Sequence, residues 1–320
     1  MMDVIQQLRE QAKKLLEEKK VDLVIGFGQG TELARTTPVF IDSPEGVSKL
    51  TWGPFCANNL AKYLTDYKNA PGNIAVVVKG CDSRSINRLL DDNQISRDKV
   101  VIIGVPCSGQ LEWQKVAAEI KPGASLKETA DNGDSFSVKT DAGDYKFDKK
   151  DYLLHRCLVC ENPNPVVSDL TIGKEQPVKN YEDRFAEVQA LEQMSTEEKN
   201  AYWDKQFSRC LRCYACRNVC SVCTCQICVF DQMLPMWVSK RTNLSENTAF
   251  HLTRAFHVAG RCVDCGECDR VCPMDIPLRK LNQKIHKDLG DLFESPTPGT
   301  KPGLASPLGE FSPGDPEEFM

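Results

Sequence analysis

Cys210-Leu-Arg-Cys213-Tyr-Ala-Cys216-Arg-Asn-Val-Cys220 is the first of two matching runs, and the second reads Cys262-Val-Asp-Cys265-Gly-Glu-Cys268-Asp-Arg-Val-Cys272-Pro273. In each run, three cysteines separated by two residues can hold three corners of one iron–sulfur cube. The fourth cysteine, placed after a longer gap, reaches the neighbouring cube. Two runs in the same register therefore predict two [4Fe–4S] clusters. We expect the first on Cys210, Cys213, Cys216 and Cys272, and the second on Cys262, Cys265, Cys268 and Cys220.

The composition agrees with metal-ligating cysteines. The chain has 320 residues, 16 cysteines and a formal net charge of −5. It is too long for a small disulfide-stapled secreted protein, and its charged start does not resemble a secretory signal. No apolar run reaches the roughly 18 residues of a membrane span. We therefore expect reduced cysteines in an anaerobic cytoplasm, no membrane insertion, and no nucleic-acid partner.

Short apolar runs predict an α/β domain over residues 1–175. An amphipathic helix is expected over residues 1–20, followed by buried parallel strands at 21–26, 74–78 and 100–105. Residues 82–93 have the spacing of a crossover helix between the last two strands. Residues 134–149 alternate around a turn and predict a β-hairpin.

The pattern becomes helical after this domain. Helices are expected over residues 181–194, from a capping box at Ser195, and from Ser245 to about Val258. The 41 residues between Cys220 and Cys262 also read as largely helical. Residues 176–294 are therefore predicted to be an all-helical two-cluster domain rather than one built on hairpins.

Residues 295–320 hold six prolines and little that could form a core. We expect this tail to dock on a partner subunit, with resting on its own chain as the alternative. The apolar groups expected to anchor it are Phe293, Leu304, Leu308, Phe311 and Phe319.

Eight further cysteines need an explanation. Cys81 and Cys107 follow two predicted parallel strands, where ligands of an open α/β sheet gather. With the Cys157–Cys160 pair they predict a third [4Fe–4S] cluster. Cys56, Cys223, Cys225 and Cys228 could form a further centre, giving up to four clusters, or could be packed as small apolar residues.

Other motifs are weak. Gly26-Phe-Gly28-Gln-Gly30 lacks the spacing of a dinucleotide fingerprint and is better read as a glycine-dependent turn. The four histidines are scattered, and His251 and His257 are expected to be packing or surface residues. No catalytic arrangement stands out.

The cysteine pattern carries a family resemblance. Residues 79–84 (KGCDSR), Gly104-Val-Pro-Cys107 and Cys157-Leu-Val-Cys160 resemble the beta-subunit family of deazaflavin-reducing hydrogenases and formate dehydrogenases. The C-terminal region also resembles the helical two-cluster ferredoxin of heterodisulfide reductase small subunits and succinate dehydrogenase iron–sulfur subunits. The resemblance implies electron transfer between a flavin or deazaflavin and clusters of partner subunits. The flavin-holding glycine-rich segment of the family is not evident, since residues 51–60 (TWGPFCANNL) stand in its region, which leaves FAD binding open.

We therefore expect an iron–sulfur electron-transfer subunit of an anaerobic oxidoreductase complex, without catalytic residues of its own. It would relay electrons between a dehydrogenase or hydrogenase partner and a heterodisulfide-reductase-like, flavin-bifurcating module. One alternative is a flavin- or deazaflavin-dependent reductase subunit with its own active site. The other is a scaffold whose cysteines bind zinc.

Overall fold

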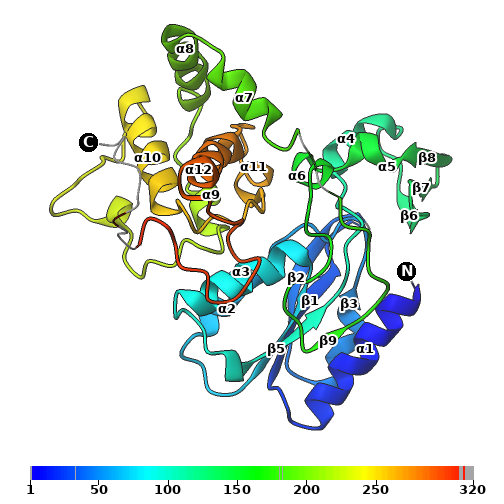
Figure 1. Cartoon of the computed structure of the whole chain (residues 1–320). Coiled ribbons are helices and arrows are strands. Elements are labelled where there is room, and N and C mark those ends of the chain that lie inside the picture. Colours follow the sequence, from blue (N-terminus) through cyan, green and yellow to red (C-terminus); the bar gives the residue numbers. More distant parts are fainter. Residues whose placement is uncertain (1, 33, 180, 182, 310–312, 314–320) are drawn as a thin grey trace. The chain divides into compact units, whose positions relative to one another are not determined.

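The computed structural model describes residues 2–32, 34–179, 181, 183–309 and 313 (Figure 1). The chain divides into two compact units, and each is described by itself. Unit 1 comprises Met1–Arg84 and Ile95–Tyr181, and unit 2 comprises Ser85–Gln94 and Glu182–Met320. The helix α3 (Gly80–Asp91) begins in unit 1 and ends in unit 2. The sequence pattern placed the boundary between the α/β domain and the helical domain near residue 175. It did not indicate that residues 85–94 belong to the second unit.

Unit 1 is built on a mixed sheet, so the predicted α/β class is confirmed. Strands β1 (Leu23–Gln29), β4 (Ile74–Val78), β5 (Val100–Gly104) and β9 (Leu170–Thr171) run parallel in that spatial order. Strands β2 (Thr36–Ile41) and β3 (Leu50–Thr51) pair antiparallel with β1. Every residue of β4 is buried, as expected of a central parallel strand covered on both faces. The remaining short elements of this region are α1 (Met2–Glu17), η1 (Pro44–Lys49), α2 (Ala61–Leu64), η2 (Thr65–Tyr67) and η3 (Arg97–Lys99).

The glycines after the first strand do not form a turn, so that expectation was wrong. Gly26 and Gly28 lie inside β1, which continues to Gln29. A Cβ on Gly26 would lie 2.3 Å from the Leu50 side chain, and one on Gly28 would lie 2.4 Å from Val39. Glycine is therefore needed because β2 and β3 pack closely against β1, not because the backbone turns.

A small antiparallel sheet completes unit 1. The predicted hairpin is confirmed as β7 (Ser135–Thr140) and β8 (Asp144–Asp148), and β6 (Leu126–Asp131), which was not predicted, adds to it. Phe136, Val138 and Phe147 form a separate core with residues near α4 (Trp113–Glu119). Two short helices, α5 (Lys149–Tyr152) and α6 (His155–Leu158), lead from this sheet to the Cys157–Cys160 pair.

Unit 2 is helical. Its further elements are α7 (Ala186–Glu192), α8 (Thr196–Phe207), α9 (Ala215–Asn218), η4 (Val229–Asp231), α10 (Leu244–His257), α11 (Glu267–Arg270) and α12 (Leu278–Phe293). The capping box at Ser195 is confirmed, with both reciprocal hydrogen bonds present. Helix α10 begins after Asn243 rather than at Ser245. Residues 221–243 are irregular apart from η4, so the stretch between the two cysteine runs is less helical than expected. None of the described helices is long and apolar enough to cross a membrane.

The first part of the tail lies on its own unit. Asn87 Nδ2 donates to Gly299 O at 2.9 Å, and Arg88 Nη1 donates to Leu304 O at 2.6 Å. The backbone N–H of Gly303 donates to Asp91 Oδ1 at 2.8 Å. Figure 1 shows this red segment beside the end of α3. Leu308 is 55% exposed, and the expected anchors Phe311 and Phe319 lie outside the described residues.

Truncation after Glu294 should destabilise unit 2. It removes three hydrogen bonds to the end of α3, each worth about 1 kcal/mol net, and leaves Arg88 buried without its carbonyl partner. We expect a loss of roughly 2–4 kcal/mol in the free energy of unfolding, measured by thermal or denaturant unfolding under anaerobic conditions. Truncation after Gly309 keeps all three bonds and is the matched control with wild-type stability. A chain ending at Glu294 that unfolds like the wild type would contradict this role of the tail.

Candidate metal centres

Four cysteines of unit 1 gather at the carboxyl ends of neighbouring parallel strands. Cys81 follows β4 in the first turn of α3, and Cys107 follows β5. Burial, followed by the neighbouring Cys157 thiol, raises the pKa of Cys107 to about 11. Burial and then Asp82 raise the pKa of Cys81, to which Cys107 also contributes. Burial and then Cys157 likewise raise the pKa of Cys160. The residues predicted for a third cluster are therefore close together.

Close backbone packing brings the Cys157–Cys160 pair to the strand ends. A Cβ on Gly80 would lie 1.9 Å from Asn162 O, so only glycine lets this loop reach the end of β4. The backbone N–H of Cys107 donates to Pro163 O at 2.9 Å. Gln110 Nε2 donates to Cys107 Sγ at 3.2 Å, and the Gln110 N–H donates to Cys157 Sγ at 3.4 Å. The loop is thus positioned by contacts that involve the cysteines themselves.

Buried cations surround this site. Lys79 is 1% exposed, pairs with Asp82 at 2.9 Å and lies 4.4 Å from the centre of the Phe27 ring. Arg84 is 5% exposed, and its Nε and Nη1 find no hydrogen-bond partner among the described residues. Arg84 and Arg156 both act to lower the pKa of the Cys160 thiol, although the effect of burial is larger and the pKa is raised. Unpaired buried donors beside buried thiols fit a negatively charged iron–sulfur cluster held by thiolates.

The two C-terminal runs adopt the same backbone conformation. Arg212 and Tyr214 have φ of 51° and 61°, and the corresponding Asp264 and Gly266 have φ of 55° and 62°. Each run then enters a single helical turn, α9 or α11, and these two turns contact each other. Left-handed conformations at non-glycine residues are strained and persist where the loop must take a particular shape. Here they let each run curl around a common point.

One cavity brings together the four cysteines predicted for the first cluster. Its space is about 330 Å³, and its lining includes Cys210, Cys213, Cys216 and Cys272. Cys272, which belongs to the second run, therefore lies beside the three cysteines of the first run, and its role as their fourth ligand stays a prediction. His251, which was expected to be a packing or surface residue, is buried and also lines the cavity. Its ring stacks on that of Phe207, with 4.8 Å between the ring centres. Neither of its ring nitrogens has a partner among the described residues. Burial, Arg254 and Arg212 lower the pKa of His251 to about 3, so its neutral ring carries one donor that the cavity leaves unused.

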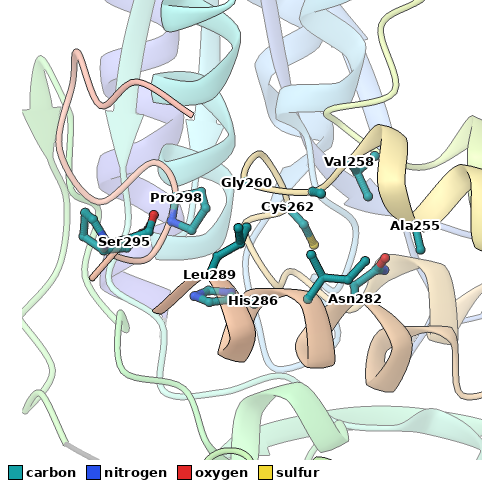
Figure 2. Close-up of a pocket in the computed structure, with 12 residues that line it drawn as sticks. Ala255, Val258, Gly260, Cys262, Asn282, His286, Leu289, Ser295 and Pro298 are labelled. Atoms are coloured by element: carbon teal, nitrogen blue, oxygen red, sulfur yellow. The ribbon is translucent and has the colours of Figure 1, made fainter. Parts of the chain in front are cut away.

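The cysteines predicted for the second cluster also lie close to one another. The Cys220 and Cys265 thiols contribute, after burial and Asp264, to raising the pKa of Cys262. Cys262 and Cys265 likewise act on Cys268. A pocket of about 300 Å³ reaches Cys262, and its lining includes Asn282, His286 and Leu289 of α12 (Figure 2). Ser295, Pro296 and Pro298 of the tail complete its lining.

The other four cysteines, which could form a further centre, do not lie together at one place. A hydrogen bond from the Cys223 thiol is the largest influence on Cys220 and lowers the Cys220 pKa. Cys228 interacts with Arg217, and Cys225 is exposed. Cys56 belongs to unit 1, where burial raises its pKa, Lys79 acts to lower it and the Cys107 thiol acts to raise it. Across the part of the chain that the structure describes, no three His, Cys, Asp or Glu side chains converge on the position of a single metal ion. A further centre on these four cysteines stays a prediction.

Sequence reasoning missed Arg84, His251 and Arg254, which lie among the cysteines. No spacing rule identifies such residues, because they come from helices that only the fold brings beside the ligands. A weak signal was available for Arg84, which lies three residues after Cys81 on the same helix.

Comparisons with known proteins agree with the cysteine pattern. Residues 72–188 match the family model for the C terminus of the beta subunit of coenzyme F420 hydrogenase/dehydrogenase. F420-dependent formate dehydrogenase subunit beta of Methanocaldococcus jannaschii is 26% identical, with 87% of this chain and 88% of the relative aligned. F420-dependent formate dehydrogenase 1 subunit beta of Methanococcus maripaludis is 28% identical, with 87% of each chain aligned. A chain of the F420-reducing [NiFe] hydrogenase complex from Methanosarcina barkeri matches with a TM-score of 0.40 and 17% identity, over 64% of this chain and 84% of that one.

The resemblance to the beta-subunit family of deazaflavin-reducing enzymes is thus confirmed. The region matched by the family model contains all four cysteines of the unit 1 site, Cys81, Cys107, Cys157 and Cys160.

Replacing Cys272 by Ser should damage the cluster held by Cys210, Cys213 and Cys216 and spare the other. The reason is that Cys272 lines the same cavity as these three cysteines although it belongs to the second run. Low-temperature EPR of the reduced variant should show the loss of one cluster signal and of the magnetic coupling between the two. Replacing Cys220 by Ser is the reciprocal control. If Cys272→Ser alters the cluster of Cys262, Cys265 and Cys268 alone, the crossed assignment is wrong.

Replacing Gly80 by Ala should abolish the unit 1 cluster. The added methyl group would collide with Asn162 O and push the loop that carries Cys157 and Cys160 away from β4. Iron per chain should fall from about twelve to about eight, since one cube of four irons is lost. Gly290→Ala in α12 makes the same chemical change where the nearest atom is 4.0 Å away, and should keep all iron. Full iron content in Gly80→Ala would show that this close approach does not matter.

Proposed function

We propose that this chain is an iron–sulfur electron-transfer subunit of a cytoplasmic, anaerobic oxidoreductase complex. It relays electrons between a dehydrogenase or hydrogenase partner and a heterodisulfide-reductase-like, flavin-bifurcating module. The observation that carries the proposal is the cavity shared by Cys210, Cys213, Cys216 and Cys272, which joins ligands from both runs. The names of the two formate dehydrogenase beta subunits support a place in a multi-subunit redox enzyme.

The bound cubes supply one-electron chemistry, and the residues of the chain supply their setting. Apolar side chains such as Phe250, Ile276 and Leu278 line the first cavity and keep water from the ligands. Arg84, His251 and Arg254 offer buried donors toward the thiolates. Hydrogen bonds to sulfur, nearby charge and exposure are the features that set a cluster potential. These residues can therefore set the reduction potentials of the clusters, and this task requires no catalytic group in the chain.

An exposed apolar segment supports contact with a partner. Ile227, Met233, Leu234, Met236 and Trp237 lie within eleven residues and are 44–94% exposed. The segment adjoins Cys228 and Phe230, which pack in the same apolar cluster as Cys216. Contiguous exposed apolar side chains of this kind mark protein interfaces. A partner seated here would approach the cluster whose ligand Cys213 is exposed. A docking role for the tail rests on Leu308 and the residues after it.

A flavin- or deazaflavin-dependent reductase is the second candidate, because both formate dehydrogenase relatives are named F420-dependent. Acid-released flavin from the anaerobically purified complex separates this candidate from a pure relay. The identities of the subunits that copurify under the same conditions test the proposed partners directly.

Three [4Fe–4S] clusters should be present per chain. Anaerobic analysis should give about twelve iron and twelve acid-labile sulfide, since each cube contains four of both. A fourth centre would raise both counts. A count of about eight of each would show that unit 1 holds no cluster. Zinc in place of iron, without sulfide, would favour the scaffold alternative instead.

A further inference from the structure

Helix α10 runs between the two C-terminal cluster sites. Phe250 and His251 line the cavity of the first cluster. Ala255 and Val258 line the pocket that reaches Cys262 of the second, as Figure 2 shows. Arg254 lies between these two pairs, three residues after His251 and four before Val258. Residues at these separations share one helix face, so Arg254 belongs to the face that joins the two sites.

The Arg254 side chain has no carboxylate partner. It is 3% exposed, and its Nη2 donates to Cys216 O at 3.0 Å. No ion pair joins it to an acidic group of the described chain, and its Nε has no hydrogen-bond partner there. An arginine guanidinium stays protonated in proteins, so Arg254 carries a buried positive charge.

A buried, unpaired cation is expensive unless a negative group lies beside it. The groups around Arg254 that can carry negative charge are cysteines: Cys216 of the first set, Cys220 and Cys268 of the second, and Cys223, which belongs to neither. Thiolates and sulfides of bound clusters would provide that charge, and the free Nε–H would find an acceptor in them.

We infer that Arg254 is a positioning residue shared by both C-terminal clusters, donating a hydrogen bond to cluster sulfur and raising both reduction potentials with one fixed charge. The inference rests on the proposed two-cluster function. Reduction adds one electron to a cube and makes it more negative, so a cation in a low-dielectric interior favours the reduced form. Because the same charge serves both clusters, it raises both potentials together and limits the difference between them.

The test is an EPR-monitored redox titration of Arg254→Gln. Both midpoint potentials should fall by about 59 mV or more. For a one-electron couple this shift corresponds to a tenfold change in the reduction equilibrium constant. Arg254→Lys keeps the charge but loses Nε, so its potentials should fall by less. It should also lose one exchangeable-proton coupling seen by ENDOR after transfer to D₂O. Arg241→Gln removes an exposed arginine of the same unit, whose charge is screened by water, and should leave both potentials unchanged.

The outcomes separate the inference from the proposed function. Iron, sulfide and the two reduced EPR signals of the wild type test the clusters themselves, whatever Arg254 does. With clusters present, wild-type potentials in Arg254→Gln would overturn the inference, and a shift of only one cluster would overturn the shared role. If Arg254→Gln does not retain clusters, Arg254→Lys decides: unchanged potentials with unchanged exchangeable-proton couplings would overturn it.

Discussion

Placing many cysteine thiols close together in one chain is the constraint on which this structure depends. Thiolates that held a cluster would bring negative charge into a low-dielectric interior, and such charge requires nearby cations or donors. The chain meets this need from its own helices. Arg84 stands by the unit 1 site, and Arg254 stands between the two sites of unit 2. Both keep buried nitrogens without partners in the described chain, which makes sense only beside a negative group.

Two unrelated folds solve the same problem of ligand placement. In unit 1 the predicted ligands come from the ends of parallel strands and from one loop, and Gly80 lets that loop pack against the strand end. In unit 2 they come from two curled runs with matching left-handed residues, Arg212 in the first and Asp264 in the second. The unit 1 site depends on a sheet whose order is set by distant strands. The unit 2 sites depend mainly on local conformation and on contact between α9 and α11.

This difference explains how much the sequence could predict. That Cys272 lies in the same cavity as Cys210 could be predicted from spacing, because the conformation of each run is local. The strand ends at Cys81 and Cys107 followed from apolar runs, since buried parallel strands are continuous and easily recognised. The reason for Gly26 and Gly28 did not follow, because it lies in β3 and β2, whose short strands gave no clear pattern. Helix α3 could not be divided between two units from its sequence alone, because it reads as one continuous helix and its apolar residues Ile86, Leu89 and Leu90 all follow the break at Arg84.

Arg254 shows why charge in a core is harder to anticipate than ligand spacing. An arginine in an amphipathic helix is usually a solvated residue, and its neighbours His251 and Ala255 give no sign that this face is buried. Only the fold shows that residues of α10 line both the cavity of the first cysteine set and the pocket that reaches Cys262. If Arg254 serves two clusters as we propose, its charge cannot be optimised for one of them alone and constrains the pair. The two potentials would then be linked through the helix, and a change at either site that moves the guanidinium would be felt at the other.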